Sequence, residues 1–264
     1  MTYADLLDTE RLRAELADAD RLWTTIEVVA ETGSTNADLA ARARAGEPAG
    51  VVLATDHQVS GRGRLGRTWT APAGSSIAMS VLLRPARDPA SWTWLPLLAG
   101  LAVADSLRAV AEVPAMLKWP NDVLVEDAKV CGVLAERVDS PSGPACVLGL
   151  GINVHLTADE LPVPTATSLA VLRPGEPFVR AEIMATVLAT LALLYHRWAD
   201  GLDTELAVDY VARSGTLGRS VRVLTGDGST VTGEATGVDA EGRLRIRTPT
   251  GVLTFAAGDV THLR

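Results

Sequence analysis

The segment Gly61-Arg62-Gly63-Arg64-Leu65-Gly66-Arg67-Thr68-Trp69 combines glycines with three arginines. Glycine lets the backbone approach a ligand closely, and guanidinium groups donate paired hydrogen bonds to phosphate or carboxylate. Because the three charges repel one another, we predict that residues 60–70 are disordered until an anion neutralises them. The segment lacks the Gly-Lys-Ser/Thr ending of a Walker A loop. It predicts an anion-binding loop, and a solvated linker or an RNA-binding Gly/Arg tract is the alternative interpretation.

Two lysines lie in sheltered contexts further along the chain. Lys118 follows Met116-Leu117 and opens the turn Lys118-Trp119-Pro120-Asn121-Asp122, where a compact ammonium charge suits a phosphate. Lys129 begins the apolar run that ends at Leu134, and a lysine on a strand is held rigidly enough to orient a carboxylate. Each lysine by itself also fits an ordinary surface position.

Other polar groups suit the head of a small ligand. Ser34, Thr35 and Asn36 follow Gly33 and precede a predicted helix, so they offer hydroxyls and free N–H groups at a helix N-terminus. Gln58 follows a predicted strand and precedes the basic loop. Helix capping explains the first group equally well.

Asn153 ends the run Gly149-Leu150-Gly151-Ile152-Asn153. Glycines inside an apolar strand indicate that a ligand or another backbone comes close, or that the strand bulges. The asparagine amide would add a donor and an acceptor there. The histidines show no zinc-ligand spacing, and neither a Gly-x-Ser-x-Gly elbow nor a Cys/His pairing indicates a covalent nucleophile.

Hydrophobic periodicity predicts the elements that must position these residues. We expect helices over residues 5–18, 37–45, 92–111 and 178–199. We expect strands over residues 24–30, 51–54, 77–83, 123–125, 130–138 and 145–154, and a loop over 60–76. After about residue 214, short β-rich runs between Gly-containing turns predict a barrel of about five strands. The prediction is therefore an α+β fold, with a mixed sheet and packed helices in a catalytic domain of residues 1–214 and a small barrel in residues 215–264.

Composition narrows the function. Hydrophobic residues make up 47% and charged residues 21%, as in a globular enzyme. The net charge is −8, which is the wrong sign for a general nucleic-acid binder. The charged N-terminus does not resemble a signal peptide, and no run of about 18 apolar residues indicates a membrane span. Cys131 and Cys146 are expected to be buried and reduced, so we expect a cytoplasmic protein.

Taken in order, these motifs resemble the biotin protein ligase family, also called biotin–acetyl-CoA-carboxylase ligases. The resemblance covers about residues 31–153 and resumes more weakly over the predicted barrel. It rests on the Gly-Arg-Gly-Arg-x-Gly-Arg-x-Trp loop, the Lys-Trp-Pro-Asn-Asp turn and the gap to Lys129. It implies a core similar to class II synthetases and a C-terminal barrel similar to SH3 domains. About 25 residues precede the first predicted core strand, too few for the N-terminal DNA-binding domain of some members, so we expect a short form without DNA repression.

The resemblance also implies residue roles. Biotin would be held by Ser34, Thr35, Asn36, Gln58, Arg62, Gly63, Arg64 and Lys129. The nucleotide would be held by Arg64, Arg67, Trp69, Lys118, Asn121, Asp122, Asn153 and, most weakly, Arg264. Catalysis would depend on Lys129, Arg62, Arg64 and Lys118, with Asp122 supporting the phosphate side or a Mg²⁺ whose full ligand set the sequence does not identify.

The implied activity is ATP-dependent biotinylation of a lysine on a biotin carboxyl carrier protein through biotinyl-5′-AMP. Joining a carboxylate to a phosphate requires charge neutralisation, which clustered lysines and arginines supply. A lipoate or octanoate ligase is the nearest alternative, since such enzymes share the general fold and chemistry. An RNA-binding module and a biotin sensor that does not consume ATP are the alternatives from other classes. The oligomeric state stays open.

Overall fold

The computed structural model of the chain describes residues 7–16 and 22–263. A mixed seven-stranded sheet has the order β1-β2-β5-β9-β8-β7-β6. Its strands are β1 (Thr25–Thr32), β2 (Val51–Gln58), β5 (Ser76–Leu83), β6 (Met116–Lys118), β7 (Asp122–Val125), β8 (Ala128–Val138) and β9 (Ala145–Asn153). Only the β1–β2 pair is parallel among these neighbours; the other pairs are antiparallel.

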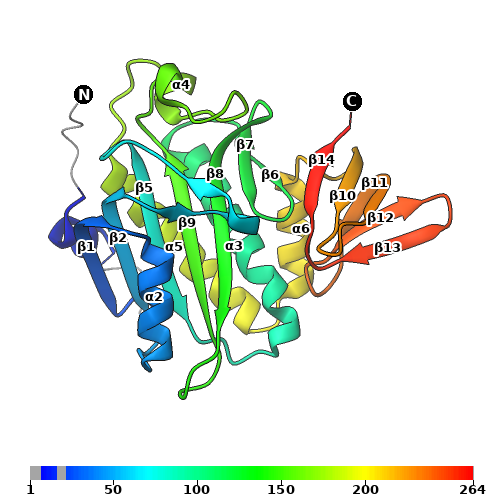
Figure 1. The fold of residues 1–264 in the computed structure, drawn as a ribbon, viewed down its shortest axis with the longest axis horizontal. Coiled ribbons are helices and arrows are strands. Elements are labelled where there is room, and N and C mark those ends of the chain that lie inside the picture. The colour runs from blue at the N-terminus through cyan, green and yellow to red at the C-terminus, as the bar shows by residue number, and fades with distance from the viewer. Residues whose placement is uncertain (1–6, 17–21, 264) are drawn as a thin grey trace.

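Helices cover both faces of this sheet (Figure 1). Helix α2 (Thr35–Arg44) packs on one face, where Leu39 and Ala43 meet the apolar side chains of β2, β5 and β9. Helices α3 (Trp94–Val110) and α5 (Arg180–Ala199) pack together on the other face over the larger core. Side chains along a strand alternate between the two faces of the sheet. Because helices cover both faces, all eight residues of β5 are buried.

Shorter elements complete the first part of the chain. These are α1 (Thr9–Glu15), α4 (Leu169–Leu172), α6 (Asp203–Arg213), the 3₁₀ helices η1 (Arg64–Gly66), η2 (Pro89–Thr93) and η3 (Ala158–Glu160), and the short strands β3 (Gly61–Arg62) and β4 (Thr68–Trp69). The stretch from Pro89 to Val110 is long and apolar enough to cross a membrane by length and composition. In this fold 67% of that apolar window is buried against the chain's own sheet and helices, as in the core helix of a folded domain.

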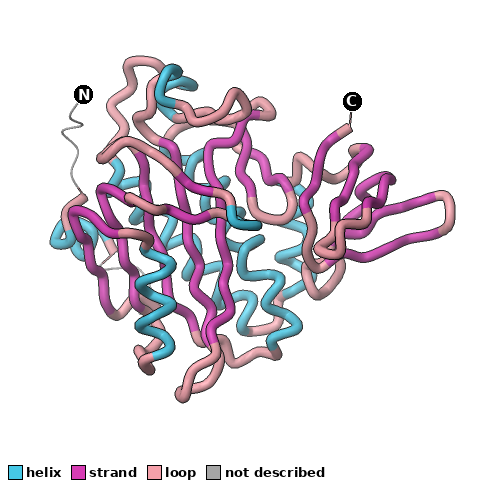
Figure 2. The backbone as a smooth tube through the Cα atoms, viewed as in Figure 1, coloured by secondary structure: helices cyan, strands magenta, loops and turns pink. Residues whose placement is uncertain are grey.

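The last part of the chain forms a separate antiparallel sheet with the order β13-β12-β11-β10-β14 (Figure 2). Its strands are β10 (Ser220–Leu224), β11 (Thr230–Val238), β12 (Leu244–Thr248), β13 (Gly251–Phe255) and β14 (Asp259–His262). It joins the first part through Trp94 and Trp119, whose indole N–H groups donate to the carbonyls of Ala240 and Gly242. The prediction of about five β-rich runs is confirmed, and they are consistent with a small SH3-like barrel.

The predicted α+β class and mixed sheet are confirmed, with three local corrections. Where the structure describes the stretch predicted as a helix over 5–18, the helix covers only Thr9–Glu15. The predicted loop over 60–76 is wrong in part, because β3 and β4 pair as a hairpin around η1. Helix α6 was not predicted, although its segment is amphipathic, with Leu206 and Tyr210 buried four positions apart and Val208 and Val211 exposed.

Candidate active site

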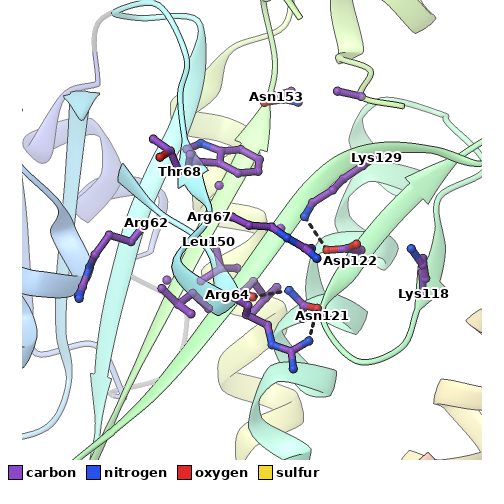
Figure 3. A pocket seen from close by; sticks show the side chains of 18 of the residues that line it. Arg62, Arg64, Arg67, Thr68, Lys118, Asn121, Asp122, Lys129, Leu150 and Asn153 are labelled. Atoms are coloured by element: carbon purple, nitrogen blue, oxygen red, sulfur yellow. Dashed lines mark hydrogen bonds and ion pairs between the residues drawn. The ribbon is translucent and has the colours of Figure 1, made fainter. Parts of the chain in front are cut away.

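One cavity of about 680 Å³ lies over the sheet, between the β3–β4 hairpin and the C-terminal sheet. The side chains around it come from both parts of the chain, and Figure 3 labels some of those from the first part. The residues predicted for the site that line it are Ser34, Thr35, Asn36, Gln58, Arg62, Gly63, Arg64, Arg67, Trp69, Lys118, Asn121, Asp122, Lys129 and Asn153. The remaining predicted residue, Arg264, lies outside the described residues. Predicted residues that are up to 119 positions apart in the sequence, from Ser34 to Asn153, therefore meet around one space.

One end of the cavity is a buried polar network that begins at the start of α2. The Thr35 backbone N–H and hydroxyl donate to Gln58 Oε1 at 2.9 and 3.1 Å. The Thr35 hydroxyl also lies 2.7 Å from the hydroxyl of Ser80, which donates to Asn36 Oδ1 at 2.6 Å. Asn36 Nδ2 donates to Glu136 Oε2 at 2.7 Å. Such a satisfied network fixes donors and acceptors in space, as recognition of a small polar head requires.

Ser34 has a different local role from its two neighbours. Its side chain accepts a hydrogen bond from Ala37 N at 3.4 Å, and its extended backbone makes it the N-cap of α2. The capping interpretation is therefore correct for Ser34, while Thr35 and Asn36 turn into the network. At the other end of the helix, Gly46 has φ +96°, the left-handed conformation expected of a residue that ends a helix.

The glycines of β9 let two side chains lie flat on the sheet. A Cβ at Gly149 would come 2.2 Å from Asn36 Oδ1, and a Cβ at Gly151 would come 2.5 Å from the Trp69 indole. The strand pairs in continuous register through both glycines, so the bulge alternative is wrong. The expected close approach is real, but within the chain it is made by side chains of the site rather than by another backbone.

Lys129 and Asp122 form an ion pair at the centre of the cavity wall (Figure 3). Lys129 Nζ lies 2.6 Å from Asp122 Oδ1 and 5.7 Å from the centroid of the Trp69 ring. The lysine side chain is 33% exposed, so its charge still faces the cavity. Strand β8 carries Lys129 as predicted, and Asp122 and the indole face hold the ammonium in place.

Each arginine of the Gly/Arg-rich loop has a partner within the protein. Arg62 pairs with Glu136 at 3.0 Å, Arg64 donates to Asn121 Oδ1 at 3.0 Å and to the Gly258 carbonyl at 3.2 Å, and Arg67 pairs with Asp259. These partners offset the mutual repulsion on which the prediction of a disordered loop was based. Burial lowers the pKa of the Arg64 guanidinium, although Asp259 and Asp122 oppose the effect. An arginine nevertheless stays charged in proteins.

The far end of the cavity is cationic and includes the C-terminal sheet. Lys118 ends β6, and Arg219 and His262 come from the second part of the chain. Arg219 Nη1 lies 3.0 Å from Asp127 Oδ1 and 3.3 Å from His262 Nδ1. Burial lowers the pKa of His262, and the charges of Arg219 and Lys118 lower it further.

Asn153 and Asn121 are partly committed to the protein. Asn153 is buried, and its amide donates to the Thr167 carbonyl at 2.9 Å. The Asn121 amide donates to the Val133 carbonyl at 2.9 Å, which leaves its oxygen to Arg64. These bonds fix both amides at the cavity edge.

The sequence analysis missed several residues of this site. Ser80 is polar within the apolar run Ile77–Leu83, a signal that was available. Glu136 and Asp259 had no local signal, because their partners are distant in the sequence: Glu136 meets Asn36 and Arg62, and Asp259 meets Arg67.

Within the described ranges, no group of three or more His, Cys, Asp or Glu side chains is placed to hold a metal ion. The three carboxylates that line the cavity, Asp122, Asp127 and Asp259, each pair with a lysine or arginine. Burial raises the pKa of both Cys131 and Cys146 to about 12, so neither is a thiolate at neutral pH.

The fold and cavity define a two-part enzyme architecture that also occurs in known proteins. Residues 28–153 match the Biotin/lipoate A/B protein ligase family, and residues 216–263 match the Biotin protein ligase C terminal domain. The biotin–[acetyl-CoA-carboxylase] ligase of Mycobacterium tuberculosis is 44% identical, over 98% of this chain and 96% of that protein. The bifunctional ligase/repressor BirA of Bacillus spizizenii is 31% identical, over 96% of this chain and 76% of that protein.

The solved structures agree with the sequence comparisons. The biotin protein ligase from Aquifex aeolicus in complex with biotin and ATP superposes with a TM-score of 0.78 at 29% identity, covering 92% of this chain and all of that one. The chain belongs to the biotin protein ligase family. This confirms the resemblance inferred from the loop and turn motifs.

Proposed function

We propose that this protein joins biotin to a lysine of a biotin carboxyl carrier protein, with ATP as the source of activation and biotinyl-5′-AMP as the intermediate. The observation that carries the proposal is the cavity with the uncharged amide and hydroxyl groups of Thr35, Asn36, Gln58 and Ser80 at one end, cations at the other and Lys129 between them. A small polar ligand with a carboxylate tail and a nucleotide match these three regions in order.

We assign the biotin end to Ser34, Thr35, Asn36 and Gln58, with Arg62, Gly63 and Arg64 covering the ligand. The network supports this assignment because its amide and hydroxyl groups match a neutral ureido ring, which both donates and accepts hydrogen bonds. We assign the nucleotide end to Arg64, Arg67, Trp69, Lys118, Asn121, Asp122 and Asn153. Arg264 stays a weaker candidate at that end.

In the first step, an oxygen of the biotin carboxylate attacks the α-phosphorus of ATP, and the bond to the bridging oxygen breaks to release pyrophosphate. We assign to Lys129 the role of holding the two reacting anions together, and to Lys118, Arg62 and Arg64 further neutralisation, because all four line the cavity. In the second step, the carrier lysine attacks the acyl carbon and AMP leaves. The hairpin over the cavity would shield the mixed anhydride from water between the steps.

Mg²⁺ belongs to this proposal as the partner of ATP. It commonly binds through one or two carboxylates together with substrate phosphates, and Asp122, which pairs with Lys129, would support either the phosphate-binding side chains or this ion. We also propose that residues 1–214 form the catalytic domain and residues 215–264 the C-terminal domain, and that the protein acts in the cytoplasm without binding DNA.

Biotin-dependent exchange of labelled pyrophosphate into ATP tests the proposal. We expect exchange with biotin and none with lipoate or without an acid. Exchange with lipoate alone would assign the chain to lipoate chemistry. No exchange from folded protein supplied with Mg²⁺ would overturn the ligase function and favour a biotin sensor.

A further inference from the structure

A buried ion pair lies beside the cavity without lining it. Arg180 is the first residue of α5, and its side chain is fully buried. Its Nη2 donates to Asp56 Oδ1 at 2.6 Å, and its Nη1 donates to the Ser76 carbonyl at 3.0 Å. A buried arginine is rare in proteins unless its charge is paired, so this position has a specific structural demand.

The pair occupies a fork in the central sheet. Strands β2 and β5 pair from Val51–Leu82 as far as Thr55–Ala78 and then separate. Beyond this point β2 continues alongside β1 to Gln58, and β5 is paired with β9 from Ser76 onward. Arg180 bridges the two branches where they separate, with one nitrogen on the Asp56 carboxylate and the other on the Ser76 carbonyl.

The fork is also where the loop over the cavity begins and ends. Residues 59–75 leave the β2 branch just after Gln58 and return to the β5 branch at Ser76. Two further bonds tie the return stem: Gly74 N donates to the Asp56 carbonyl at 2.8 Å, and His155 N donates to the Ser75 carbonyl at 2.7 Å. The return stem is thus bonded directly to Asp56, whereas the outgoing stem follows Asp56 along β2 and is bonded to the Thr32 and Gly33 carbonyls through Val59 N and Ser60 N.

We infer that Arg180, through its hydrogen bonds to Asp56 and Ser76, is a positioning residue that holds the Gly/Arg-rich loop closed over the activated intermediate. The inference rests on the proposed ligase function for its catalytic consequence. Arg180 does not line the cavity, so it acts through the stems and not by touching substrate. Its loss should increase escape of the intermediate more than it slows synthesis.

Replacing Arg180 with lysine tests the need for two hydrogen bonds from one planar guanidinium, because lysine keeps the positive charge but cannot reach both partners with two fixed nitrogens. Arg87 provides a matched control. It also joins a carboxylate and a carbonyl, bonding both oxygens of Asp203 at 2.6 and 2.7 Å and the Trp198 carbonyl at 2.6 Å, but it is remote from the cavity lining. The variants are R180K, D56N and R87K in the full chain.

The first readout is the rate at which labelled biotinyl-AMP leaves the enzyme, divided by its rate of formation. We expect R180K and D56N to raise this ratio on the order of tenfold, as small displacements away from the chemistry can do, and R87K to leave it unchanged. An unchanged ratio in R180K, or an equal rise in R87K, would overturn the inference.

The second readout is independent of catalysis. Hydrogen exchange of residues 59–75 in the ligand-free chain should be faster in R180K than in the wild type, with no change in R87K. Equal hydrogen exchange in the wild type, R180K and R87K would refute the positioning role of Arg180, even if the wild type proves inactive. A wild type that forms no adenylate would instead overturn the proposed function, and the exchange data would still decide the role of Arg180.

Discussion

Replacing Lys129 with alanine separates charge neutralisation from folding. The side chain makes one ion pair with Asp122 and lies over Trp69, and it is 33% exposed. Partly exposed pairs contribute about 0–1 kcal/mol to the free energy of unfolding. We therefore expect a stability loss of about 1 kcal/mol, which lowers the melting temperature by roughly 2–4 °C in a chain of this size. The protein stays folded, because stabilities of about 5–15 kcal/mol are typical.

The expected loss of activity is much larger. A preorganised group that faces developing charge in a sheltered site contributes about 2.7–4 kcal/mol to the transition state, or a factor of about 10²–10³ in rate. We expect biotin-dependent pyrophosphate exchange to fall by that factor in K129A. A loss of about 1 kcal/mol in the free energy of unfolding beside a loss of about 2.7–4 kcal/mol in transition-state stabilisation identifies a catalytic contact.

The control is R197A, which removes another partly exposed ion pair. Arg197 is 29% exposed and lies 2.8 Å from Asp209, away from the cavity lining. It should show a similar small stability loss with unchanged exchange. If K129A exchanges at the wild-type rate, or if its loss of activity follows its loss of folded protein, then the assignment of Lys129 is wrong.

Four further predictions concern Gly151, the Gly/Arg-rich loop, the two cysteines and His262. G151A should expel the Trp69 indole and abolish exchange, whereas G237A, which has open space around its Cβ, should behave as wild type in the same assay. Residues 60–70 should gain hydrogen-exchange protection when biotin and ATP are added, and equal protection would contradict a ligand-dependent loop. Both cysteines, with pKa values of about 12, should resist iodoacetamide at neutral pH until the protein is denatured; rapid labelling of the native chain would contradict their burial. Burial lowers the pKa of His262, so the unfolded chain binds more protons than the native one near the unperturbed value of about 6.5, and stability falls as the pH drops through this region. H262Q should lose less melting temperature on acidification than the wild type does.

Much of the fold was predictable because its elements follow local patterns. The helical spacing of Ile183, Val187 and Leu191 predicted α5, and the six strands expected between residues 24 and 154 were found to within a few residues, whereas the short β3, β4 and β6 were not predicted. The family was also predictable from the sequence, because the residues of the Gly/Arg-rich loop and of the Lys118–Asp122 turn are adjacent in the chain. Prediction from local patterns fails where tertiary contacts determine the backbone conformation. At η1, for example, Leu65 takes a left-handed conformation inside a hairpin.

The sequence by itself determined which side chains carry the charge and hydrogen-bonding groups of the site. Only the tertiary structure decided how they are paired. Glu136 bonds to both Asn36 and Arg62, which lie 100 and 74 positions before it in the chain. Arg180 similarly acquires its role from a fork between strands that lie 104 and 124 positions before it. Such contacts have no local sequence signature, because sheet order and register, rather than spacing along the chain, bring the partners within hydrogen-bonding distance.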